Sequence, residues 1–137
     1  MADVFSVKQR SQIMARVRGT ENAATELRLI AIFEEHRIKG WRRKSMLFGK
    51  PDFVFRTERV ALFVDGCFWH GCKIHGAIPK TNAAFWQAKI EKNRTRDKLV
   101  GKRLRASRWV VLRLWQHELK DGQKVANKVR RVLRRTQ

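Results

Sequence analysis

Two cysteines and two histidines have the types and spacing that could bind a metal ion. Cys67, Cys72 and His75 form a Cys-x4-Cys-x2-His pattern within one short stretch, and His117 follows a distant apolar segment. Two thiolates and two imidazoles are a ligand set of tetrahedral, structural Zn²⁺. A local disulfide or free cysteines with unrelated histidines are the alternatives. In a cytosolic protein the nearby histidines favour metal ligation, which could order a stretch with little apolar content.

Two carboxylates could form a second metal site of a different character. Asp52 begins a predicted strand and Asp65 directly follows the apolar run 60–64, so a hairpin would bring the two side chains together. Oxygen ligands beside a basic surface suit Mg²⁺, which is usually held by one or two carboxylates. A Pro-Asp pair alone more often marks a turn. His70 lies outside the zinc set, and a neutral imidazole near a metal is a candidate general base.

Two further acids have an ambiguous setting. Glu26 directly precedes an apolar run whose residues surround most of a predicted helix, so we expect that helix to be largely buried and Glu26 to need a partner or a metal. Asp97 lies among many basic residues, where a surface salt bridge is the simpler interpretation. His36 has no comparable neighbours and is expected at the surface.

The elements that must position these residues follow from periodicity and capping signals. We expect a basic N-terminal arm and short helix over residues 1–18, then a second helix that begins at Thr20 or Asn22 and fades at Gly40. The other expected elements are strands over 52–55 and 60–64 joined by a turn at 56–59, a helix over 83–106 capped by Thr81 or Asn82, a strand over 109–115 and a helix over 123–135. Helical spacing directs Ile90, Val100 and Leu104 into the core, and in the last helix Val125, Val129, Val132 and Leu133.

Composition bounds the class of protein. The 137 residues are 43% apolar, which suits one globular domain over 1–137. Lys and Arg outnumber Asp and Glu by 32 to 12, a formal net charge of +20, so we expect a polyanion partner. The sequence shows no apolar run long enough to span a membrane, and residues 1–6 lack a signal-peptide pattern. We therefore expect a cytoplasmic protein.

A series of short motifs runs in order along nearly the whole chain: Pro51-Asp52-Phe53-Val54, the block 63–72 (FVDGCFWHGC), Pro79-Lys80-Thr81-Asn82, Phe85-Trp86, Lys89-Ile90, Asn93, Arg96-Asp97, and Trp109-Val110-Val111 with Trp115. Together these motifs resemble the very short patch repair (Vsr) DNA mismatch endonucleases. The resemblance implies an α/β, restriction-endonuclease-like fold with a central mixed β-sheet flanked by helices and a zinc-tied loop. It also implies Mg²⁺-dependent, strand-specific nicking on the 5′ side of the thymine in a T:G mispair left by deamination of 5-methylcytosine.

The resemblance also implies roles for individual residues. Asp52 would be the direct Mg²⁺ ligand, together with the backbone carbonyl of Val64. Glu26 and His70 would belong to the acid/base shell, and Asp97 would orient His70 or a water on the metal. The aromatic residues expected to wedge beside the mismatch are Phe68, Trp69 and Trp86, with Lys89 and Asn93 as further DNA contacts. Stacking an aromatic ring on a base offsets part of the cost of unstacking; core packing is the alternative for Trp69 and Trp86.

Two positions depart from the family pattern. Some members carry histidine where this chain has Asp65, so the role of this carboxylate stays open. The Trp-Glu-Cys that commonly ends the last strand is Trp115-Gln116-His117 here, and histidine can replace cysteine on zinc. The implied partner is double-stranded DNA with a T:G mismatch at the bacterial nucleoid, with mismatch-repair proteins as possible partners, and a monomer suffices for one nick. A sequence-specific restriction or homing-type nuclease and a non-catalytic zinc-stabilised DNA-binding module are the alternatives.

Overall fold

The computed structural model describes residues 24–43, 45–67, 72, 78 and 80–136. Its centre is a four-stranded mixed sheet in the order β1-β2-β3-β4, formed by β1 (Trp41–Arg43), β2 (Phe53–Phe55), β3 (Val60–Asp65) and β4 (Val110–Trp115). The first three strands pair antiparallel, and β4 runs parallel to β3. The parallel pair requires a crossover, which α2 (Ala83–Ala106) supplies. A mixed α/β architecture is thus confirmed.

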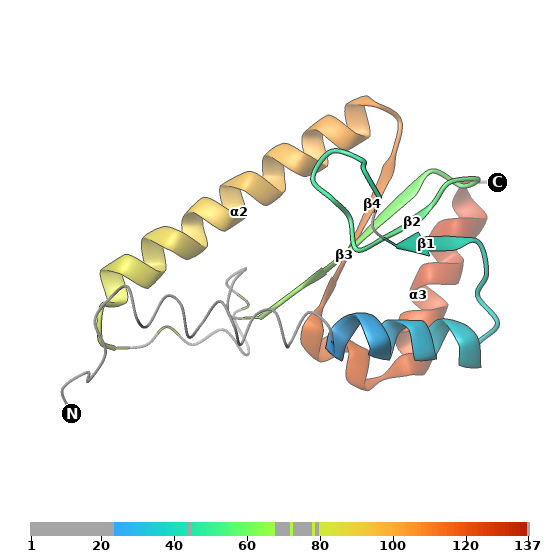
Figure 1. Ribbon diagram of the computed structural model, residues 1–137, viewed down its shortest axis with the longest axis horizontal. Helices are drawn as coiled ribbons and strands as arrows, with labels where there is room; N and C mark the ends of the chain where they lie inside the picture. Colours follow the sequence, from blue (N-terminus) through green and yellow to red (C-terminus); the bar gives the residue numbers. More distant parts are fainter. Residues whose placement is uncertain (1–23, 44, 68–71, 73–77, 79, 137) are drawn as a thin grey trace.

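Helices cover both faces of this sheet (Figure 1). On one face, a helix over 24–35 and α3 (Gly122–Arg135) pack on alternate residues of the strands, among them Phe53, Phe55 and Leu62. On the other face, α2 packs through Val100 and Leu104 on Ala61 and Phe63. Because side chains alternate along a strand, each residue of β3 belongs to one face or the other. The catalytic candidates can therefore be assigned to a face.

The helix over 24–35 differs from its prediction in length and in burial. It ends well before Gly40 because Arg37 takes a left-handed conformation, φ 56°, and the N–H of Ile38 donates to the carbonyl of Phe33 at 2.8 Å. This is a Schellman cap, closed by burial of both Ile38 and Phe33 in the core. The expectation of a largely buried helix is wrong, since Leu27 is 63% exposed.

Two local features of the chain were not foreseen. β1 is a short edge strand whose Trp41 contacts the ring of Phe53, with 5.7 Å between centroids. The other two residues of β1 are both arginines, so the sequence has no alternation of apolar and polar residues that would predict a strand here. The expected side-chain cap of α2 is also wrong: Asn82 occupies the N-cap position, but it has a φ of 58° and makes no side-chain capping bond. By contrast, Asp121 caps α3 by accepting from the N–H of Lys124 at 3.1 Å.

The remaining elements agree closely with expectation. The helix predicted over 83–106 has these bounds, the last strand begins at Val110, and α3 begins at Gly122. The inward positions Ile90, Val100 and Leu104 are all buried. No helix in the described part of the chain is long and apolar enough to cross a membrane.

Candidate active site and metal centre

Asp52 is held at the end of β3 by the antiparallel pairing of β2 and β3. Phe53 pairs with Leu62, so the residue before β2 lies beside the last residues of β3. There the backbone N–H of Val64 donates to Asp52 Oδ2 at 2.7 Å. A carboxylate offers two oxygens with about four lone-pair sites, so it can accept this bond and still bind a cation. The structure thus brings Asp52 to the N–H of Val64. Binding of Mg²⁺ by Asp52 and by the carbonyl of Val64 stays a prediction.

Asp65 ends the same strand and pairs with an arginine that sequence reasoning missed. It is 7% exposed, and Arg113 Nη1 of β4 donates to Asp65 Oδ1 at 2.9 Å. The parallel register sets Phe63 opposite Arg113, so the arginine lies next to the end of β3. A single charged residue inside the apolar strand 110–115 was the signal that could have identified it.

Asp97 reaches this region from α2, and Asn93 lies one turn before it on the same helix. Both are half-buried, and they lie in the middle of a helical stripe whose other members are buried. The stripe consists of Trp86, Ile90, Asn93, Asp97, Val100 and Leu104. Asp97 Oδ1 lies 3.6 Å from Arg113 Nη1, so Arg113 contacts one acidic residue at the end of β3, Asp65, and one on α2, Asp97. The surface salt bridge considered for Asp97 is therefore a partly buried one.

Glu26 is engaged differently. Its carboxylate forms an ion pair with Arg43 of β1, and both side chains remain partly exposed. This contact satisfies the expected need for a partner without a metal. The helix that carries Glu26 packs against the face of the sheet opposite to α2. Participation of Glu26 in an acid/base shell stays a prediction.

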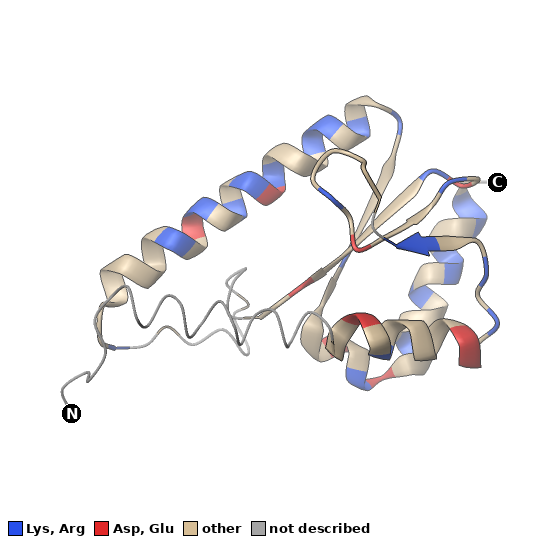
Figure 2. Cartoon of the chain, in the orientation of Figure 1, with Lys and Arg blue, Asp and Glu red and all other residues tan. Residues whose placement is uncertain are grey.

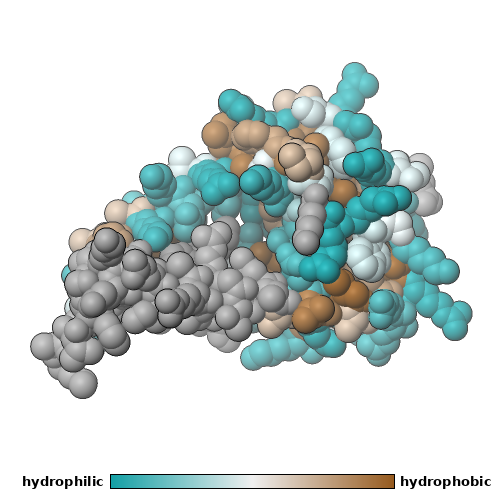
Figure 3. Space-filling view, viewed as in Figure 1, coloured by the Kyte–Doolittle hydropathy of each residue, from teal (hydrophilic) through white to brown (hydrophobic). Residues whose placement is uncertain are grey.

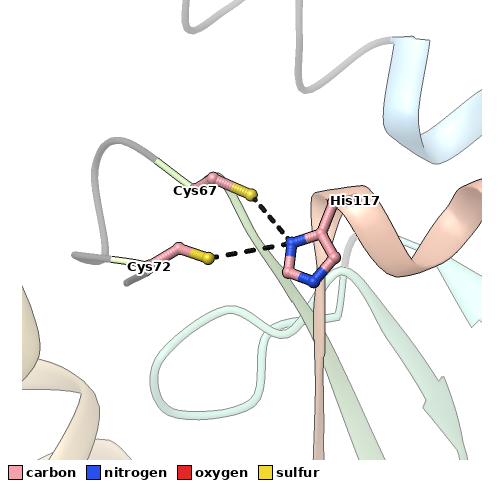
Figure 4. A group of neighbouring side chains, drawn as sticks. All are labelled: Cys67, Cys72 and His117. Carbon is pink, nitrogen blue, oxygen red and sulfur yellow. Dashed lines mark hydrogen bonds between the residues drawn. The ribbon is translucent and has the colours of Figure 1, made fainter. Parts of the chain in front are cut away.

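Cys67, Cys72 and His117 converge where the parallel strands β3 and β4 end (Figure 4). The two thiols point toward the imidazole, and His117 Nδ1 lies 3.3 Å from Cys67 Sγ and 3.7 Å from Cys72 Sγ. Cys67 directly follows Gly66 after β3, and His117 lies in the 3₁₀ helix η1 (Gln116–Lys120) that follows β4. The backbone N–H of Cys72 donates to the carbonyl of Cys67 at 2.9 Å, which holds the two cysteines close together.

The distances within this cluster suit a tetrahedral zinc ion. Sulfur and nitrogen ligands on Zn²⁺ lie about 3.5 Å apart, given Zn–S near 2.3 Å and Zn–N near 2.0–2.1 Å. Burial raises the pKa of the Cys67 thiol, and the neighbouring Cys72 adds to the rise, although backbone hydrogen bonds from His117 and Gln116 oppose it. A bound cation would favour the thiolate instead. These three residues could therefore hold a metal ion.

Several predicted residues lie outside the described part of the chain. These are Phe68, Trp69, His70 and His75. Trp86 is described and is 1% exposed, with Phe85 edge-on against it at 4.9 Å and the Lys89 ammonium 5.9 Å from its ring centroid. Trp86 belongs to neither of the two hydrophobic clusters that the described residues form around the sheet, and its place beside a mismatch stays a prediction.

Basic side chains line α2 (Figure 2), on the side of the sheet where Asp65 and Asp97, here called the acidic cluster, meet Arg113. They include Lys92, Arg94, Arg96, Lys98, Lys102, Arg103 and Arg105, all exposed. In the space-filling view, hydrophilic side chains cover much of the described surface (Figure 3). These features define an α/β protein whose strand ends gather acidic and metal-ligating side chains next to a surface suited to a polyanion.

Comparison with known proteins then gives the family. The model of the family described as DNA mismatch endonuclease Vsr matches residues 2–75, and relatives more than 30% identical match over nearly the whole chain. The chain therefore belongs to the DNA mismatch endonuclease Vsr family, as its motifs indicated.

Three relatives illustrate the range of similarity. The type II nicking enzyme V.XorIIP of Xanthomonas oryzae is 36% identical over 135 residues, which are 97% of this chain and 98% of that protein. The DNA mismatch endonuclease Vsr of Escherichia coli is 35% identical over 129 residues, 93% of this chain and 81% of that protein. The match to the type II nicking enzyme V.NaeI of Lentzea aerocolonigenes is 49% identical but local, covering 50% of this chain and 42% of that protein.

Proposed function

We propose that this protein is a Mg²⁺-dependent DNA endonuclease that nicks one strand on the 5′ side of the thymine in a T:G mispair. The observation that carries the proposal is Asp52, fixed by the Val64 N–H at 2.7 Å at the acidic end of the sheet. Family membership and the names of the relatives, a DNA mismatch endonuclease and several nicking enzymes, support it. We further propose that the sheet is the core of a restriction-endonuclease-like domain over 1–137.

The chain would divide the chemistry among few residues. Asp52 and the carbonyl of Val64 would hold Mg²⁺, which supplies charge stabilisation at the scissile phosphate when bound. His70 would accept the proton of the attacking water, and Asp97 would orient either His70 or a water on the metal. The basic residues of α2 would hold the phosphate backbone in register. Cys67, Cys72 and His117, completed by His75, would hold a structural Zn²⁺.

Several relatives are named type II nicking enzymes, which supports a second candidate, a nickase that recognises its sequence context rather than the mispair. The same substrate set can separate the two. A mispair-dependent enzyme cuts only the duplex with T:G, whereas a sequence-dependent one also cuts the duplexes in which that pair is T:A or C:G.

The test is single-strand cleavage of end-labelled duplexes that differ in this one pair. We expect Mg²⁺-dependent nicking beside the thymine of T:G alone. Asp52→Ala should abolish nicking because it removes the carboxylate ligand, and gel mobility shifts should show unchanged DNA affinity. A variant that still nicks at the wild-type rate would remove Asp52 from the site.

A further inference from the structure

The strongest unexplained feature is the position of Arg113. Leu112 and Leu114 on either side of it point into the core beneath the helix over 24–35 and α3. Strand alternation therefore directs Arg113 to the α2 face, which is also the face of Phe63 and Asp65. The guanidinium of an arginine side chain carries a positive charge. A fixed positive charge thus lies inside the proposed active site.

Four contacts surround the guanidinium. Nη1 donates to Asp65 Oδ1 at 2.9 Å and lies 3.6 Å from Asp97 Oδ1. Nη2 donates to the backbone carbonyl of Asp97 at 3.4 Å. The guanidinium carbon lies 4.3 Å from the ring centroid of Phe63. The rigid, planar group therefore links the end of β3 to the middle of α2, two elements that are far apart in sequence.

This arrangement bears directly on the neighbouring Asp52. The carboxylate of Asp52 accepts a hydrogen bond from the N–H of Val64, the residue before Asp65. Phe53 faces the helix over 24–35 and α3, so strand alternation directs Asp52, the residue before it, to the α2 face that also carries Asp65. Three carboxylates, Asp52, Asp65 and Asp97, thus lie on the α2 side of the sheet, and Arg113 bridges two of them, Asp65 and Asp97. Without a compensating charge they would repel one another and together attract additional cations.

We propose that Arg113 is a positioning residue that neutralises Asp65 and Asp97, fixes both relative to Asp52 and so restricts catalytic metal binding to Asp52. The proposal rests on the proposed function. On this view Asp65 is not a metal ligand, and Arg113 occupies the place that a second cation would otherwise take. Loss of the guanidinium should leave two carboxylates that can recruit a cation at the wrong position.

The experiment compares Arg113→Met, Arg113→Lys and a matched control, Arg59→Met. Arg59 also donates to backbone carbonyls, of Ser107 at 2.6 Å and Arg108 at 3.2 Å, and its guanidinium carbon lies 4.8 Å from the ring of Trp109. It contacts none of the three carboxylates in these interactions. The control therefore loses similar packing and similar bonds without changing the proposed site.

Two measurements should be made on each full-length protein. Single-turnover nicking at increasing Mg²⁺, on whichever duplex the wild type cuts, should fall about 10²-fold for Arg113→Met at saturating Mg²⁺, since misplaced catalytic groups commonly cost that much. The DNA dissociation constant should stay within about twofold, and the half-saturating Mg²⁺ should change. Arg113→Lys should recover part of the rate because it restores the charge but not the fork of donors.

Electron paramagnetic resonance of Mn²⁺ gives a count of bound ions that needs no turnover. We expect more Mn²⁺ per chain, or tighter Mn²⁺ binding, for Arg113→Met than for wild type and Arg59→Met. Unchanged Mn²⁺ binding together with unchanged Mg²⁺ dependence would overturn the proposal and leave Arg113 a packing residue. If the wild type nicks no duplex, the proposed function fails, whereas the Mn²⁺ count still decides the role of Arg113.

Discussion

At the scale of residues, the site depends on a few short contacts made at strand ends. Asp52 is fixed by a backbone N–H, and Asp65 is fixed by a guanidinium. Each contact orients a carboxylate without relying on a flexible loop, which suits chemistry that needs exact placement of charge. The Cys/His cluster follows the same plan, since Cys67 and His117 are both within two residues of the end of a strand.

His117 offers a sharp test of the metal cluster. His117→Ala should lower the zinc content of the purified protein and its melting temperature, because it removes one of the side chains that would bind the ion together with the two thiols. His117→Cys should retain zinc, since a thiolate also binds this ion and cysteine commonly occupies this position in the family. Zinc content can be measured by mass spectrometry and stability by thermal melting with and without a chelator. A wild-type protein without zinc, or one whose melting is indifferent to the chelator, would contradict the assignment.

At the scale of elements, the C-terminal half of α2 packs on the sheet through Val100 and Leu104. Near its C-terminal end Val100 packs against the loop that precedes β2. A Cβ on Gly49 would lie 2.4 Å from Val100 Cγ1, and Gly49 has a φ of +82°. This loop also leads to Asp52, so the packing of one glycine on α2 helps to set the start of β2 and its carboxylate.

Gly49→Ala should therefore destabilise the protein more than Gly40→Ala does. Both glycines have a positive φ, but at Gly40 no heavy atom lies within 4 Å of the added Cβ. The backbone strain is common to the two variants, so the difference reports the clash with Val100, for which we expect about 1–3 kcal/mol. Urea denaturation followed by circular dichroism measures it. Equal free energies of unfolding would show that the loop does not press on α2.

The sequence predicted those elements that have a long periodic pattern and missed those set by tertiary contacts. The helix over 83–106 was predicted with its observed bounds because its inward positions repeat over several turns. β1 has three residues, and its partly buried Trp41 packs on Phe33 and Phe53, contacts that no local sequence pattern records. The end of the first described helix depends on Ile38 reaching the core.

The same division applies to the candidate site. Asp52 beside Val64, and Cys67 and Cys72 beside His117, were predicted because residue types and family motifs marked them, and the structure brings each group together. Arg113 was missed because its role depends on contacts with residues of β3 and α2 that are distant from it in the sequence. A burial pattern can suggest which side chains lie inside, but it does not show which charges meet there.

At the scale of the whole molecule, basic helices lie on both sides of the sheet. The net charge of +20 includes the exposed basic residues of α2, which lie on the side of the sheet that carries Asp65 and Arg113. α3 on the opposite side is also basic, with Lys124 and Arg131 exposed. If one duplex reaches the acidic cluster, it must approach from the α2 side.

DNA binding should therefore depend on salt mainly through α2. The double variant Arg94→Gln with Lys98→Gln should reduce the slope of log affinity against log salt by about 2, since each lost phosphate contact lowers it by about 0.9. The matched double variant on α3, Lys124→Gln with Arg131→Gln, should leave the slope nearly unchanged. Fluorescence anisotropy with a labelled duplex at several salt concentrations measures both. A larger effect from the α3 pair would place the duplex on the other face.

The length of α2 also affects how the sequence can drift over evolutionary time. Its 24 residues extend about 36 Å, close to one turn of duplex DNA, whereas the six residues of β3 extend about 20 Å. If α2 lies along a phosphate backbone, charges spread over such a rod would act on it collectively, so we expect a lysine lost at one position to be replaceable by one gained a turn away. Arg113 has no such substitute, because its place is defined by two carboxylates and a ring. The molecule thus combines a surface that tolerates exchange with an interior position that does not.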